Sequence, residues 1–203
     1  GRLEVRGARV TLLQWNSASP ALVFEAVDLD LARRGDRVQL QLDTRMPAQL
    51  SGVIHLKVGA ADFGGENALS WNASLHAREV SLPGWHDLLP EFSNAVDSGT
   101  ARVDLNAGGS GGADIQARLD FTAYDFRAVG ATRTLREVGG LFYLWRREDQ
   151  WALSGERVRA LSGAGEGRAT RFAATWQSRE GTLNGLQARF DRLSLGALTP
   201  VVA

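Results

Sequence analysis

Residues 22–43 decide the fold, and they read LVFEAVDLDLARRGDRVQLQLD. A period of two places every second side chain on one face of a β-strand. The segment 33–37 around Gly35 suits a short hairpin loop. The stretch therefore predicts an antiparallel strand pair that is apolar on one face and solvated on the other. The apolar positions are Val27, Leu29 and Leu31 before the turn, and Val38, Leu40 and Leu42 after it.

Alternating stretches of the same kind follow along most of the chain, and glycine-rich or polar turns separate them. Around Gly7 the apolar parity switches, which indicates a β-bulge or a strand that is buried on both faces. Near the C-terminal end, we expect Leu141, Tyr143 and Trp145 to pair with Trp151 and Leu153 across the charged turn 146–149. Roughly ten to thirteen strands in a mostly antiparallel meander result, an all-β fold. Their spacing suits a barrel, a sandwich or an open elongated sheet.

One segment, 83–94, departs from the strand pattern. Its large apolar residues fall at helical spacing. Pro83 suits a helix start, whereas Pro90 costs a helix interior one hydrogen bond and a steric clash. We therefore expect one short, broken helical insertion, with apolar residues Trp85, Leu88, Leu89 and Phe92.

Composition narrows the class of protein. The 23 basic and 23 acidic residues balance, so the chain lacks the basic footprint of a nucleic-acid-binding protein. It has no cysteine, which excludes disulfides, thiolate metal sites and a thiol nucleophile. No apolar run is long enough to span a bilayer as a helix. Residues 1–203 are expected to form a single domain, a segment cut from a longer protein.

Several motifs resemble chemical sites but have simpler explanations. The GGSGG stretch at 108–112 matches a nucleophile elbow, yet an alternating strand follows it where that motif needs a helix. The three histidines, His55, His76 and His86, have no ligand spacing in the sequence, so no metal site and no cofactor are predicted. Asp28 and Asp30 share a face, which suits a carboxylate pair, but a solvated outer face explains them more simply. The tryptophans suit either a sheet core or the rim of an apolar groove.

Three stretches carry a resemblance to a known family. They are LSWNASLHA at 69–77 leading into LPGW at 82–85, GLFYLWRR at 140–147 followed by QWAL at 150–153, and LSLGALTP at 193–200. Together they resemble the AsmA-like superfamily of Gram-negative envelope proteins, most closely its YhdP branch and more distantly TamB. The resemblance covers most of the chain, and its motifs are patterns of apolar and turn residues with no catalytic signature.

The resemblance implies a curved, taco-like open β-sheet whose concave apolar groove holds phospholipid acyl chains. The parent protein is expected to be anchored in the inner membrane, to cross the periplasm and to carry phospholipid toward the outer membrane, supporting its permeability barrier. Neighbouring segments of the same parent chain would pair with the first and last strands, and regions outside this sequence would contact the membrane. Trp85, Leu88, Leu89 and Phe92 are then a candidate gate or edge cover. The expected groove residues are Val27, Leu29, Leu31, Val38, Leu40, Leu42, Leu56, Leu75, Val103, Leu105, Leu119 and Phe121.

Two rival functions belong to other classes. A structural or protein-binding β-module would have a filled core and no lipid cargo, and would bind partners by adding strands at its edges. A hydrolase or carbohydrate-active domain would need a clustered acid pair or triad, which the sequence does not supply. We therefore expect a non-enzymatic protein.

Overall fold

The structure is a computed structural model, and it describes residues 1–12, 22–61, 69–85, 95–111, 114–162, 169–179 and 182–191. Eleven strands and one short 3₁₀ helix make up the described chain. The strand number lies within the range expected from the alternation. The strands are β1 Arg2–Leu12, β2 Leu22–Arg34, β3 Arg37–Arg45, β4 Val53–Ala61, β5 Ser70–Ser81, β6 Val96–Ser110, β7 Asp114–Ala128, β8 Leu135–Arg147, β9 Gln150–Ser162, β10 Thr170–Arg179 and β11 Thr182–Phe190.

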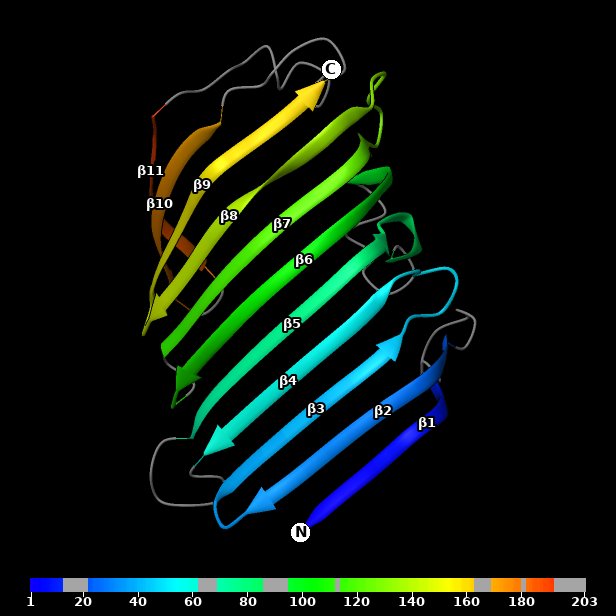
Figure 1. The fold of residues 1–203 in the computed structure, drawn as a ribbon. Coiled ribbons are helices and arrows are strands. Elements are labelled where there is room, and N and C mark those ends of the chain that lie inside the picture. The colour runs from blue at the N-terminus through cyan, green and yellow to red at the C-terminus, as the bar shows by residue number, and fades with distance from the viewer. Residues whose placement is uncertain are drawn as a thin grey trace.

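All eleven strands lie in one open antiparallel sheet, in the order of the sequence (Figure 1). Each strand pairs with the next one along the chain, so β1 and β11 are the two edges. The sheet is twisted, and β10 and β11 turn behind β9 in the view of Figure 1. The expectation of an all-β antiparallel meander is confirmed, and of the three arrangements considered the chain adopts the open sheet.

The hairpin of β2 and β3 forms as the alternation predicts. Leu31 pairs with Leu40 and Leu29 with Leu42, so the apolar residues of both strands share one face. The chain reverses between Arg34 and Arg37, where Gly35 has a φ of 61°. Glycine suits this position because it lacks the Cβ that disfavours positive φ.

The hairpin of β8 and β9 also forms, but its register differs from the expected one. Trp151 pairs with Arg146, and Leu153 pairs with Leu144. The expected pairing is therefore wrong by one residue, because the turn is only Glu148–Asp149 between the paired Arg147 and Gln150. A shift of one residue moves a side chain to the other face. The side chains of Leu141, Tyr143 and Trp145 consequently lie on the opposite face from those of Trp151 and Leu153.

Bulges interrupt the regular pairing near one end of many strands. In β1 the register shifts around Gly7, whose φ is 58°, and this agrees with the bulge expected there. In β2 and β5, successive apolar side chains of one face are three residues apart where a regular strand would place them two apart. They are Phe24 and Val27 in β2, and Ala77 and Val80 in β5. A residue with positive φ lies within each of these intervals, Ala26 in the first and Glu79 in the second. Each extra residue bends and twists its strand.

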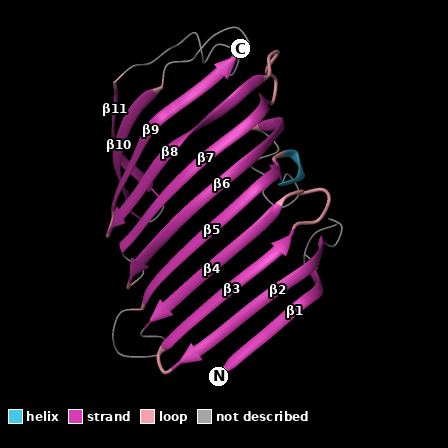
Figure 2. Cartoon of the chain, in the orientation of Figure 1, coloured by secondary structure: helices cyan, strands magenta, loops and turns pink. Residues whose placement is uncertain are grey.

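Of the segment 83–94, where a helical insertion is expected, the structure describes only residues 83–85, which form a single 3₁₀ turn, η1, at Pro83–Trp85 (Figure 2). Leu88, Leu89 and Phe92 lie outside the described residues. In the described chain, no helix has the length and apolar character that a membrane crossing requires.

A small dry core lies at the end of the strands where η1 and the connection between β3 and β4 meet the sheet. Leu50 of that connection is only 1% exposed, and its carbonyl accepts a hydrogen bond from the Ser81 amide at 2.7 Å. Leu82, beside η1, donates its own amide to the Gly99 carbonyl at 3.0 Å. We call this region the covered end. Its buried residues are Leu22, Met46, Leu50, Ala77, Val80, Leu82, Val96, Ala101 and Ala123.

Candidate functional site: the apolar face of the sheet

The strand registers join the apolar side chains into rows that cross the whole sheet. Residues that pair directly across antiparallel strands point to the same face. One row therefore crosses all eleven strands on a single face, with one glycine as its only gap. It consists of Val5, Leu29, Leu42, Leu56, Leu75, Leu105, Leu119, Phe142, Gly155, Phe172 and Phe190.

A second row runs beside the first, two residues farther along each strand, and it too is apolar throughout. We call these two rows together the open rows. Most of their side chains are half-buried, and Leu3 and Phe190 at the two edges are more than half exposed. The second row consists of Leu3, Leu31, Leu40, Val58, Ala73, Ala107, Ala117, Leu144, Leu153, Ala174 and Ala188.

The twelve residues expected to line the groove all lie on this face. Eight of them belong to the open rows. Val103 and Phe121 pair with each other one step closer to the covered end, and Val38 lies one step farther from it. Val27 is 6% exposed and lies within the bulge of β2, between Glu25 and Asp28. The cross-strand registers therefore place these twelve residues side by side on one face, which the alternation within single strands could not establish.

Aromatic rings fill the one gap in the first row. Gly155 has no side chain, and the rings of Phe142 and Phe172 from the strands on either side approach to 6.3 Å between centroids. A Cβ at position 155 would lie 2.2 Å from the Phe172 ring, so the glycine is needed for this approach. Phe190 continues the cluster, with its centroid 6.0 Å from that of Phe172. The apolar surface thus stays continuous up to the β11 edge.

Tryptophan and arginine side chains mark the rim of this face, at the ends of the strands opposite the covered end. A third row, next to the second open row, runs through Trp71, Gly109, Ile115, Arg146, Trp151 and Trp176. In it, Trp151 of β9 and Trp176 of β10 stack with centroids 6.0 Å apart and planes 5° apart. The Arg146 guanidinium lies 5.1 Å from the centroid of the Trp151 ring. Such amphipathic side chains suit a boundary between an apolar surface and water. The rim interpretation of the tryptophans therefore has a structural basis for three of them.

Within the described ranges, no second layer packs on the open rows. The extensive contacts between strands are all between sheet neighbours, and η1 contacts β6 at the covered end. Trp85, one of the four residues considered as a gate or cover, packs against the core of that end, and its buried Nε1 has no hydrogen-bond partner. Trp85 thus covers the end of the face and leaves the open rows uncovered.

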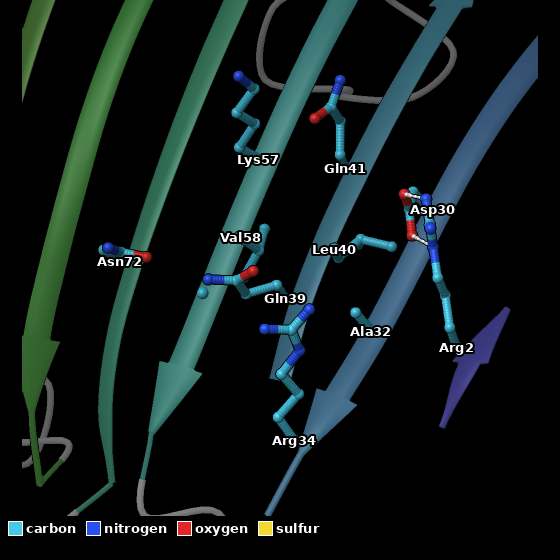
Figure 3. A pocket seen from close by; sticks show the side chains of 11 residues that line it. Arg2, Asp30, Ala32, Arg34, Gln39, Leu40, Gln41, Lys57, Val58 and Asn72 are labelled. Atoms are coloured by element: carbon cyan, nitrogen blue, oxygen red, sulfur yellow. Dashed lines mark hydrogen bonds and ion pairs between the residues drawn. The ribbon is translucent and has the colours of Figure 1, made fainter. Parts of the chain in front are cut away.

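The opposite face is polar and carries its own cross-strand interactions. Figure 3 shows part of it over β1 to β5, where Arg2 forms a two-armed contact with Asp30. The hydrogen bond from the Arg2 guanidinium lowers the pKa of Asp30. Asp28, the other member of the carboxylate pair considered from sequence, accepts the Gly7 amide at 2.8 Å. Both carboxylates thus have partners within the sheet, in agreement with their interpretation as part of a solvated outer face.

A row of histidine and aspartate side chains on this polar face was missed by sequence reasoning. His55 and His76 pair directly across β4 and β5, flanked by Asp43 and Asp104. The Nδ1 of His55 is 2.5 Å from Asp43, and the Nδ1 of His76 is 2.6 Å from Asp104. Only the strand register reveals that the two histidines are neighbours, because they are 21 positions apart in sequence. How far apart in sequence two paired residues are varies from one strand pair to the next.

These contacts stabilise the charged carboxylates. The hydrogen bond from His76 is the largest cause that lowers the pKa of Asp104, and Arg102 adds to it. The pKa of Asp43 is lowered first by its hydrogen bond from Gln41 and then by that from His55. Among the residues that the structure describes, no three His, Cys, Asp or Glu side chains are placed so that they could hold one metal ion together. Ser110, of the glycine-rich stretch, ends β6 at an exposed position, and the strand β7 follows it.

We compared the chain with known protein families, proteins and structures. No family model matches the chain, and no curated protein or solved structure matches it either.

Proposed function

We propose that the open rows bind the acyl chains of phospholipids, and that the chain is a segment of a non-enzymatic lipid conduit. The observation that supports this most directly is the unbroken apolar row from Val5 to Phe190, which no described element covers. Soluble proteins rarely leave apolar patches of this size exposed without a binding role.

The dimensions and chemistry of the face suit hydrocarbon chains. Eleven strands about 4.8 Å apart give rows about 48 Å long. Binding of an acyl chain needs continuous apolar contact and no directional bonds, and each buried methylene contributes about 0.8 kcal/mol. Arg146 and Trp151 at the rim would meet an anionic headgroup at the edge of the apolar surface. The polar face would remain in water.

The resemblance to the AsmA-like superfamily supplies the cellular setting of this proposal. We propose that the parent protein is anchored in the inner membrane, crosses the periplasm and delivers phospholipid toward the outer membrane. In such a protein the edges at β1 and β11 would pair with adjoining segments of the same chain, which would remove two unpaired strand edges and extend the rows beyond this segment.

Charge placed in the open rows tests the proposal. Leu40→Asp should reduce the phospholipid that copurifies with the chain at least tenfold, because a carboxylate would replace an apolar contact. Gln39→Asp is the matched control, since its side chain lies on the other face of the same strand. Lipid is measured by extraction and mass spectrometry, and circular dichroism verifies that both variants fold. Equal lipid loading of the two variants would contradict the proposal.

A photoreactive side chain gives a test that does not rely on a destabilising charge. Benzoylphenylalanine in place of Leu56 should crosslink to bound phospholipid, whereas the same residue in place of Lys57 should not. Crosslinking of neither position, together with the absence of lipid from the purified wild-type protein, would favour the second candidate function.

That second candidate is a structural or protein-binding module, and the covered end favours it. The dry core around Leu50 and Leu82 shows that the chain can bury part of this face by itself. A module of this kind would bind an added strand at β1 or β11 and would remain free of lipid.

A further inference from the structure

The polar face carries a second hollow, over β6, β7 and β8, that the lipid proposal does not use. It has a volume of about 690 Å³. The side chains of Asn106, Gln116, Arg118, Tyr143 and Trp145 that line it belong to the polar face by their register.

Two aromatic side chains form one wall of this hollow. Tyr143 and Trp145 are two residues apart on β8, so both project from the same face, about 7 Å apart. Neither ring belongs to the dry core or stacks with another described aromatic ring. On a solvated face, aromatic rings offer a flat apolar surface with polar groups beside it.

The polar side chains opposite the rings are unpaired. The side chains of Asn106, Gln116 and Arg118 form no hydrogen bond or ion pair with other described residues. Some arginines of this face, in contrast, form ion pairs, for example Arg127 with Asp97 and Arg159 with Glu137. Three adjacent residues are therefore left with free amide and guanidinium donors that face two aromatic rings.

A glycine lines the β6 side of this hollow. Gly108 pairs with Asn72 on one side and Gln116 on the other, and a side chain there would project into the hollow. A Cβ at this position would lie 3.1 Å from the Trp71 carbonyl oxygen, which is a tight contact. The absence of a side chain at Gly108 leaves open space beside Gln116, whose other strand neighbour is Trp145, and makes room for a flat ring.

We propose that this hollow binds a pyranose glycan. The apolar C–H face of one sugar ring would stack on Trp145 and Tyr143, while Arg118, Gln116 and Asn106 would donate hydrogen bonds to its hydroxyl or carboxylate oxygens. Asp114 is the one carboxylate among the described lining residues. The site therefore holds a sugar without the paired acids that glycoside hydrolysis requires.

The proposal is tested with the complete 203-residue chain and two defined probes, cellohexaose as the neutral glycan and hexagalacturonic acid as the acidic one. Calorimetric titration should detect binding of at least one probe at millimolar concentration or below. Trp145→Ala should weaken that binding at least tenfold, and Arg118→Gln should weaken it threefold or more. Tyr124→Ala is the control, because Tyr124 is 45% exposed on the same face but lies outside the hollow.

Binding of either probe that is lost in Trp145→Ala and retained in Tyr124→Ala supports the proposal, and the two probes distinguish a hydroxyl from a carboxylate partner of Arg118. The absence of binding for both probes would overturn it. Binding that all three variants retain would also overturn it, because the contact would then lie elsewhere. Since the hollow and the open rows are on opposite faces, neither result depends on lipid binding.

Discussion

The covered end and the open rows belong to the same face of the same strands, yet they differ in what lies over them. At the covered end, Leu50 and Leu82 from two connections press onto the sheet and leave its side chains almost fully buried. Along the open rows, the side chains of Leu56, Leu75 and Leu105 stay half-buried because only their strand neighbours touch them. Similar residues thus serve as a dry core in one region and as a candidate binding surface in the other.

The difference shows where the stability of an open sheet resides. A single sheet buries little apolar area until something packs against its face. In this chain the bulges bend the strand ends at the covered end, and the 46–52 connection and η1 complete a small core there. The remainder of the face can then stay exposed without loss of the fold.

The largest expected effect is a difference in stability loss between a substitution at the covered end and one in the open rows. Leu50→Ala should lower the free energy of unfolding by about 3 kcal/mol, because it leaves a cavity in the covered end. The measurement is urea denaturation followed by circular dichroism. Leu3→Ala, at a position 54% exposed, should cost less than about 0.5 kcal/mol. Similar losses in the two variants would remove the distinction between the regions.

A smaller effect is expected from truncation of a side chain in the open rows. Leu105→Ala should lower the free energy of unfolding by about 1.5 kcal/mol, roughly half the cost at Leu50, because the side chain is already partly exposed to solvent. The same denaturation series measures it in lipid-free protein. A loss as large as that of Leu50→Ala would mean that the open rows are packed in solution, and would favour the filled-core module.

The smallest expected effect comes from the polar face behind the open rows. The pKa of Asp104 is lowered by the hydrogen bond from His76, so its contribution to stability is present above the unfolded-state pKa of about 3.9 and is lost as the pH falls through the folded-state value. Wild-type protein should lose about 0.5–1 kcal/mol more than Asp104→Asn between pH 5 and pH 2. Parallel pH profiles of unfolding free energy for the two proteins would show that this pair contributes nothing.

Much of the fold could be predicted from local pattern. The alternation at Val27, Leu29 and Leu31 identifies a strand and its apolar face, and Gly35 identifies the turn that follows. The parity switch around Gly7 identifies a bulge in the same way. Within each strand, the expected groove residues share a face for this reason, because the alternation can be read strand by strand.

The parts that could not be predicted depend on register. The register of β8 against β9 differs by one residue from the expected one. Tyr143 and Trp145 therefore lie on the polar face, where both line the hollow, and not on the face of Trp151 and Leu153. The pairing of His55 with His76 likewise depends on the register of β4 against β5, which the alternation within each strand does not fix.

The sequence by itself determined that the chain consists of strands with one apolar and one polar face, because side-chain direction along a strand follows from a period of two and needs only neighbouring residues. The tertiary structure alone decided that the apolar faces align into unbroken rows and that one end of them is covered. These features depend on cross-strand registers, bulges and the path of the 46–52 connection, which bring together residues that are distant in the chain.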